Sequence, residues 1–202
     1  MAPPLTARGM ATRATILAAA SQLAQEHSLA GLTTDEVCRV AAVSKSQLYH
    51  YFDTRDSLVE AVASQTVHEV LALQADLFAA LDSLEGIKRW ARALIDLQVQ
   101  RDGKGGCPIG SLIGQTTEAQ RLAHDILAHG LTEWTEAIQS ALYAMQLRGE
   151  IPDHVDVQHE ARLMMVAVQG GLLLTDAHRD PSWLDIALNE RVVHLQEMCA
   201  SL

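Results

Sequence analysis

The sequence predicts an all-α protein of about nine helices. Ala and Leu, which have high helix propensity, are abundant in the 202 residues, whereas β-branched runs that could form strands are few. Hydrophobic residues make up 49% of the chain and charged residues 20%, the balance of a globular protein. Apolar residues recur at helical spacing, and helix-start signals and glycine or proline breaks separate the helical segments.

The N-terminal region is interpreted as a flexible arm, residues 1–11, followed by a helix over residues 12–27. Ile16 and Leu23 belong to one apolar stripe of that helix, at the spacing expected for a single face. Gly31 follows as a natural stop, because glycine favours the end of a helix.

Two short helices with strong start signals come next. Thr33 with Glu36, and Ser44 with Gln47, both fit the capping box, in which each side chain bonds to the other residue's backbone amide. Only a tight turn at 42–43 separates the two helices, and Val37, Val43 and Leu48 are expected to form their shared core. This arrangement is typical of a helix-turn-helix, whose second helix enters the DNA major groove.

A third start signal at Thr54 opens a long helix expected to run to about Ala80. Glycines and a proline make residues 102–108 a loop, and Pro152 marks a later break. The remaining helices are expected at about 83–101, 109–115, 118–148, 157–177 and 183–201.

The exposed face of the second short helix suits DNA. Lys45 and the helix N-terminus can meet a phosphate, and Gln47 can pair with adenine through two hydrogen bonds. Backbone contacts on either side are expected from the flanking helix starts. The predicted DNA-binding residues are Thr34, Lys45, Ser46, Gln47, Tyr49, His50, Tyr51 and Arg55.

Residues 12–60 resemble the N-terminal domain of the TetR family of transcriptional repressors. The string Val43-Ser-Lys-Ser-Gln-Leu-Tyr-His-Tyr-Phe-Asp-Thr-Arg-Asp-Ser-Leu58 carries the likeness, and a weaker one covers residues 106–112. Two positions depart from the family pattern: Ala42 stands where glycine is common, and Asp53 replaces a usual lysine. The resemblance implies DNA-contact roles for Thr34, Lys45, Gln47, Tyr49, Tyr51 and Arg55, and core roles for Leu48 and Phe52.

The resemblance also implies a division into two domains. Residues 1–56 would form the DNA-binding domain, and residues 57–202 a larger domain that binds an effector and forms a homodimer. The net charge of −10 does not by itself suggest DNA binding. However, five basic and six acidic residues occur in residues 1–60, so most of the negative charge lies outside the expected DNA-binding domain.

The last two helices are expected to form the homodimer interface. Residues 163–174 are apolar on nearly all sides, and glycines within a helix favour close approach of another helix. An apolar seam at 4-3-4-3 spacing, which ends at Cys199 and Leu202, follows in the last helix. The predicted interface residues are Gly170, Gly171, Leu188, Val192 and Leu195.

A mid-sized, mostly apolar effector is expected to bind the C-terminal domain and release the DNA. The glycine-rich segment 103–106 would be its entrance, with Cys107 and Ser111 at the rim. Apolar side chains with few charges would line the site. The predicted lining residues are Trp90, Leu94, Leu112, Trp134, Ile138 and Met165.

Other functions are less well supported by the sequence. No nucleophile–base pair or paired carboxylates indicate an enzyme, and no cofactor or metal is expected, because no histidine pair has helical zinc-ligand spacing. No signal peptide or membrane span is expected, and three scattered cysteines fit reduced thiols in the cytoplasm. Activation rather than repression remains open.

Overall fold

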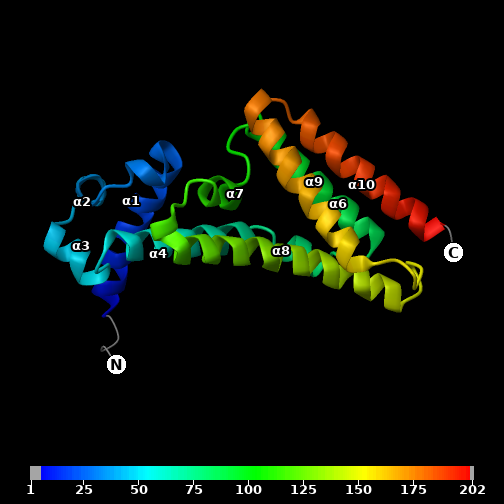
Figure 1. Ribbon diagram of the computed structural model, residues 1–202, viewed down its shortest axis with the longest axis horizontal. Helices are drawn as coiled ribbons and strands as arrows, with labels where there is room; N and C mark the ends of the chain where they lie inside the picture. Colours follow the sequence, from blue (N-terminus) through cyan, green and yellow to red (C-terminus); the bar gives the residue numbers. More distant parts are fainter. Residues whose placement is uncertain (1–5, 201–202) are drawn as a thin grey trace. The chain divides into compact units, whose positions relative to one another are not determined.

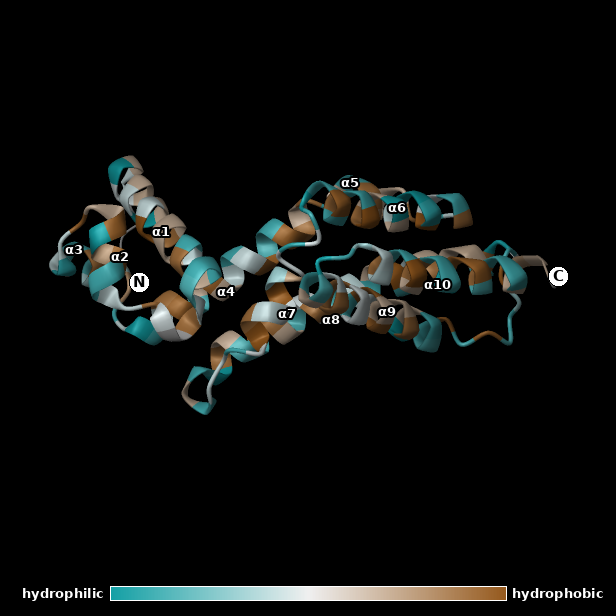
Figure 2. Ribbon diagram, turned by 90° about the horizontal axis from the view of Figure 1, so that it is seen from above, coloured by the Kyte–Doolittle hydropathy of each residue, from teal (hydrophilic) through white to brown (hydrophobic). Residues whose placement is uncertain are grey.

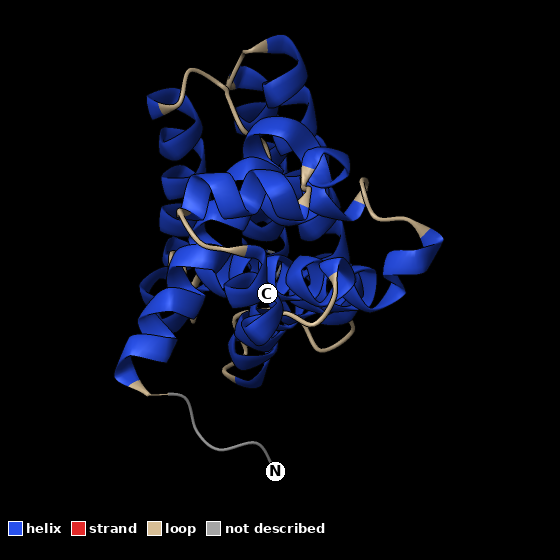
Figure 3. Ribbon diagram, turned by 90° about the vertical axis from the view of Figure 1, so that its left-hand side faces the viewer, coloured by secondary structure: helices blue, strands red, loops and turns tan. Residues whose placement is uncertain are grey.

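Helices dominate the computed structural model, which describes residues 6–200 (Figure 1). No strand occurs within this range, and short loops join the helices (Figure 3). No helix in the described range is both long enough and apolar enough to cross a membrane. The elements are α1 (Ala7–Gly31), α2 (Thr34–Ala41), α3 (Lys45–Tyr51), α4 (Arg55–Ala72), α5 (Ala75–Ala79), α6 (Leu84–Gln100), α7 (Pro108–Ile113), the 3₁₀ turn η1 (Glu118–Gln120), α8 (Arg121–Leu147), α9 (Val157–His178) and α10 (Ser182–Ala200).

The predicted helix starts are confirmed by their hydrogen bonds. The Thr33 hydroxyl accepts the Glu36 amide hydrogen at 3.2 Å, and the Ser44 hydroxyl accepts that of Gln47 at 3.2 Å. The Gln47 carboxamide oxygen accepts the Ser44 amide hydrogen in return, at 3.0 Å, which completes a capping box. In the box predicted for Thr33 and Glu36, the Glu36 carboxylate is instead hydrogen-bonded to Arg39, so only the Thr33 half forms.

The largest differences from the predicted boundaries are in α1 and in the helix expected over residues 54–80. α1 begins at Ala7, capped by Thr6, so residues 7–11 of the predicted arm are helical, while residues 1–5 lie outside the described part. The helix expected over residues 54–80 is divided into α4 and α5. Gln74, at the break, is buried and accepts a hydrogen bond from the Trp90 indole at 3.0 Å, a tertiary contact that apolar periodicity does not reveal.

The chain forms two compact units. The first reaches Val70 and includes Ser111–His129, and the second comprises Leu71–Gly110 and residues from Gly130 onward. This division differs from the boundary predicted at residue 56, which lies within α4. In the first unit α1, α2 and α3 pack against one another; in the second, α10 packs against α9 and α6.

The seam predicted on α10 lies in the core of its own chain. Leu188, Val192 and Leu195 are buried without any second copy, and α9 and α10 run side by side in Figure 1. Gly171 explains the close approach, because an added Cβ would lie 2.8 Å from Leu184 Cδ1. This corrects the expectation that these four residues face another subunit. The final seam residue, Leu202, is outside the described residues.

Gly170 differs from its neighbour because it faces open space. An added Cβ there would meet no atom within 4 Å. Exposed apolar side chains lie on the same two helices, among them Val166, Leu173, Ile186 and Val193. Apolar and polar residues are accordingly mixed along α9 and α10 in Figure 2.

Candidate nucleic-acid interface

A tight turn sets α3 against α2. Ala42 ends α2 in the left-handed conformation, with φ 53° and ψ 41°, and the amides of Ala42 and Val43 both donate to the Cys38 carbonyl. Val37 and Leu48 are fully buried beneath the turn. The core contacts therefore fix which side of α3 faces outward.

The outward side of α3 carries the residues predicted to contact DNA. Five of these residues are exposed, including Tyr49, which is 45% exposed. Tyr51 is half-buried, and the centre of its ring lies 4.9 Å from that of the His50 ring. Thr34, at the start of α2, is also partly exposed. The exposed set is Lys45, Ser46, Gln47, Tyr49 and His50.

Acidic side chains neutralise the basic groups of this surface. Lys45 Nζ lies 2.7 Å from an Asp35 carboxylate oxygen, and this contact raises the pKa of Lys45. Arg39 pairs with Glu36 one helical turn away, and its hydrogen bond lowers the pKa of the Glu36 carboxyl. Neither of these two ion pairs is predicted from the sequence, although the position of both acids in the first turn of α2 fits the helix dipole. A phosphate contact by Lys45 would compete with its ion pair to Asp35.

Gln47 has two competing uses. Its carboxamide oxygen already accepts from both the Ser44 amide and the Ser44 hydroxyl. A two-bond contact with adenine requires both the oxygen and the nitrogen of the carboxamide. Reading adenine in this way would therefore cost the capping box of α3.

Arg55 does not extend to the surface as predicted. Its guanidinium donates from Nε to the Leu32 carbonyl at 2.9 Å and from Nη2 to the Leu29 carbonyl at 2.6 Å. Both acceptor residues are buried. The structure therefore corrects the expected phosphate contact: Arg55 joins the start of α4 to the junction between α1 and α2.

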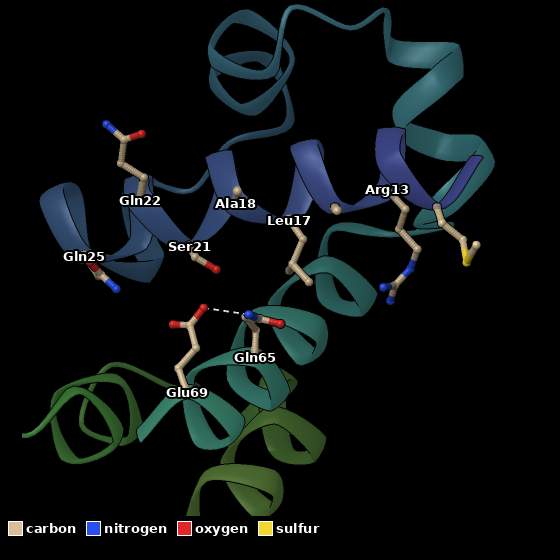
Figure 4. A pocket seen from close by; sticks show the side chains of 10 residues that line it. Arg13, Leu17, Ala18, Ser21, Gln22, Gln25, Gln65 and Glu69 are labelled. Atoms are coloured by element: carbon tan, nitrogen blue, oxygen red, sulfur yellow. Dashed lines mark hydrogen bonds between the residues drawn. The ribbon is translucent and has the colours of Figure 1, made fainter. Parts of the chain in front are cut away.

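An unpredicted groove of about 900 Å³ lies between α1 and α4 in the same unit (Figure 4). Arg13 lines one part of it and lies 5.0 Å from the centre of the Phe52 ring. Gln65 donates to Glu69 at 2.6 Å farther along, and the buried Ser21 hydroxyl has no hydrogen-bond partner among the described residues. Apolar and polar side chains therefore both line the groove.

The residues predicted to bind an effector are mainly in the second unit. Trp90, Leu94, Trp134, Ile138 and Met165 are all buried there, whereas Leu112 belongs to the first unit. The structure therefore does not place Leu112 in the same compact unit as the other five predicted residues.

The glycine-rich segment is fastened rather than open. Gly105 donates its amide hydrogen to Asp176 at 2.8 Å, and an added Cβ at Gly103 would lie 2.9 Å from the backbone of Arg179. Cys107, expected at the rim of an entrance, is buried. These contacts bind the segment to the C-terminal end of α9, and the entrance expected there stays a prediction.

Comparisons with known proteins cover both parts of the chain. Residues 16–62 match the family described as "Bacterial regulatory proteins, tetR family", and residues 83–190 match "Tetracyclin repressor-like, C-terminal domain". The Escherichia coli K12 protein "HTH-type transcriptional repressor ComR" is 25% identical over 155 residues, 75% of this chain and 73% of that protein. "HTH-type transcriptional regulator UidR" of the same strain is 24% identical over 177 residues, 80% of each chain.

Solved structures share the fold over nearly the whole length. A TetR transcriptional regulator from Chloroflexus aurantiacus matches with a TM-score of 0.81 at 19% identity, covering 96% of this chain and 98% of the other. A TetR-family regulator from Cytophaga hutchinsonii matches with a TM-score of 0.83 at 15% identity and the same coverage. At these identities the likeness concerns the fold.

Proposed function

Because the chain belongs to the TetR family of bacterial regulatory proteins, we propose that it is a ligand-responsive repressor. It binds a pseudo-palindromic operator as a homodimer and releases it when a small, mostly apolar effector binds the C-terminal unit. The relative from Escherichia coli that is named a transcriptional repressor supports the sign of regulation.

The exposed polar face of α3 carries the proposal. Capping at Ser44, the left-handed turn at Ala42 and the buried Leu48 present a short helix with five exposed polar or aromatic side chains. A helix of this kind fits a major groove, where side-chain amides, hydroxyls and imidazoles reach base edges. Lys45 supplies the phosphate contact once its pair with Asp35 opens.

Homodimerisation through α9 and α10 is supported by residues other than the predicted seam. Val166 and Leu173 on α9 are each 68% exposed, and Ile186 on α10 is 61% exposed. Gly170 lies between the two α9 side chains in sequence and leaves room for a partner helix. Covering these apolar groups with the same helices of a second copy would remove them from water.

Effector binding in the second unit is supported by buried polar atoms within an apolar setting. Trp134 Nε1 and Gln98 Oε1 are both buried, and neither has a hydrogen-bond partner among the described residues. An unpaired buried group is costly, so a ligand that pairs with it gains affinity. We therefore expect an apolar effector that carries at least one hydrogen-bonding group.

The proposed operator binding can be tested by selecting duplexes from a random library with the full-length protein. Selected sites should contain two related half-sites, with centres about 34 Å or a multiple of this distance apart. Tyr49→Ala and Lys45→Ala should weaken binding, whereas Tyr143→Ala should not, although Tyr143 on α8 is similarly exposed at 52%. Failure to select any duplex, or equal effects of all three substitutions, would contradict the proposal.

Effector action has a separate test. Compounds that raise the melting temperature of the protein are added to the protein–operator complex, and DNA release is measured. Trp134→Leu should reduce the response and leave operator affinity nearly unchanged. A loss of DNA binding with a retained ligand response would contradict the proposed division of roles.

A further inference from the structure

The junction between α1 and α2 has an unusual backbone. Ser28 interrupts the helical geometry near the end of α1, with φ 69° and ψ 167°, a conformation that residues other than glycine rarely adopt. Leu29 follows and is only 2% exposed. Its backbone amide is therefore shielded from water and needs an acceptor within the protein.

That acceptor is the side chain of Gln115, which is 86 residues away in the sequence. The Leu29 amide donates to Gln115 Oε1 at 2.7 Å. On the other side of the same residue, Arg55 donates to the Leu29 carbonyl. The junction is consequently held from two directions, by the start of α4 and by the connection between α7 and α8.

Gln115 is itself well fixed. Its carboxamide nitrogen donates to the Ser111 hydroxyl on α7 at 3.3 Å, and its backbone amide donates to the Leu112 carbonyl at 3.0 Å. The next residue, Thr116, shares a 3.0 Å hydrogen bond with His124 Nδ1 on α8. The carboxamide oxygen therefore reaches Leu29 from a supported position.

We propose that Gln115 is a positioning residue for the DNA-reading helices. Leu32 and Thr33 lead directly from this junction into α2, and α2 fixes α3 through the turn at Ala42. The Gln115 oxygen thereby fixes the position at which α2 and α3 begin. The connection between α7 and α8 is then a second support for these two helices, besides the start of α4. The effect on DNA rests on the proposed operator binding.

The test compares full-length variants that keep or remove the acceptor. Gln115→Leu removes it, whereas Gln115→Glu keeps an oxygen at the same distance along the side chain, loses the donor to Ser111 and adds one negative charge. Gln158→Leu is the matched control, because Gln158 is exposed on α9. Should Gln115→Leu fail to fold, Gln115→Asn replaces it, since it shortens the side chain by one methylene.

Two measurements decide the outcome. Hydrogen exchange of the free protein should accelerate about tenfold in peptides spanning residues 29–41 of Gln115→Leu, but not in α9, because a buried amide loses its partner. Affinity for a duplex selected by the unmodified protein should fall about tenfold in the same variant. Gln115→Glu should restore the exchange rate, and urea midpoints should show that all variants remain folded.

Unchanged exchange in residues 29–41 of Gln115→Leu would overturn the proposal, as would exchange in Gln115→Glu as fast as in Gln115→Leu. Accelerated exchange with full operator affinity would also refute positioning for DNA. If the unmodified protein selects no duplex, the proposed repressor function fails, whereas hydrogen exchange still decides whether Gln115 holds the reading helices.

Discussion

Replacing Arg55 with alanine separates a structural role from a phosphate contact. The side chain gives two hydrogen bonds to the carbonyls of the buried residues Leu29 and Leu32. Hydrogen bonds to a charged group contribute about 1.5–3 kcal/mol each, and water can reach part of this half-buried side chain. We therefore expect Arg55→Ala to lower the free energy of unfolding by about 2–4 kcal/mol in total.

The same substitution should leave the salt dependence of DNA binding unchanged. Each lost phosphate contact lowers the slope of log affinity against log salt concentration by about 0.9. If Arg55 contacted a DNA phosphate in each of the two subunits, its loss would thus reduce the slope by about 1.8. If it bonds only to the protein carbonyls, its loss leaves the slope unchanged. Lys45→Ala is the reciprocal control: the slope should fall and stability should remain.

Urea unfolding followed by circular dichroism gives the stability, and binding titrations between about 50 and 200 mM salt give the slope. An Arg55→Ala protein as stable as the unmodified one, with a slope reduced by nearly two, would refute the reasoning. That result would show that Arg55 contacts the DNA backbone, as the sequence predicted.

Three other substitutions test separate features. Ala42→Gly should stabilise the protein by about 0.5–1 kcal/mol, measured by urea unfolding, because glycine adopts the left-handed turn without a Cβ penalty; a loss of stability would show that the turn is unstrained. Ile186→Asp should convert the proposed dimer to monomers in sedimentation, whereas Leu147→Asp, on an exposed position of α8, should not; a persistent dimer would place the interface elsewhere. Asp35→Asn should release Lys45 and strengthen binding to random-sequence duplex by up to about fivefold per subunit at low salt; unchanged affinity in a filter-binding assay would mean that the pair does not restrain Lys45.

Helix starts could be predicted because their signals are local. Thr33 and Ser44 each cap a helix three residues before the amide that they accept, so spacing alone identifies them. The tertiary roles could not be predicted in this way. Arg55 and Gln115 both form hydrogen bonds with Leu29, from 26 and 86 residues away in the sequence. Contacts over such sequence separations produce no periodic pattern of residues that could reveal them.

The amphipathic pattern of α10 predicts a buried seam without identifying its partner. Leu188 and Leu195 have the spacing expected for a helix–helix contact, and both are buried within their own chain, where α10 packs against α9 and α6. The exposed row that includes Ile186 is interrupted by polar residues and gives a weaker signal. Sequence periodicity therefore detects the contact and cannot assign it to one subunit or two.

The ion pair between Lys45 and Asp35 affects how a DNA-binding regulator would find its operator among the other sites of a genome. Random DNA attracts a regulator almost entirely through phosphates, and it offers millions of competing sites. A lysine that already has a carboxylate partner gains less from any of these sites, so fewer molecules are detained on them. At the proposed operator, base contacts from α3 would supply the additional free energy that opens the pair. In the proposed repressor, discrimination would therefore come partly from weak attachment to all other DNA.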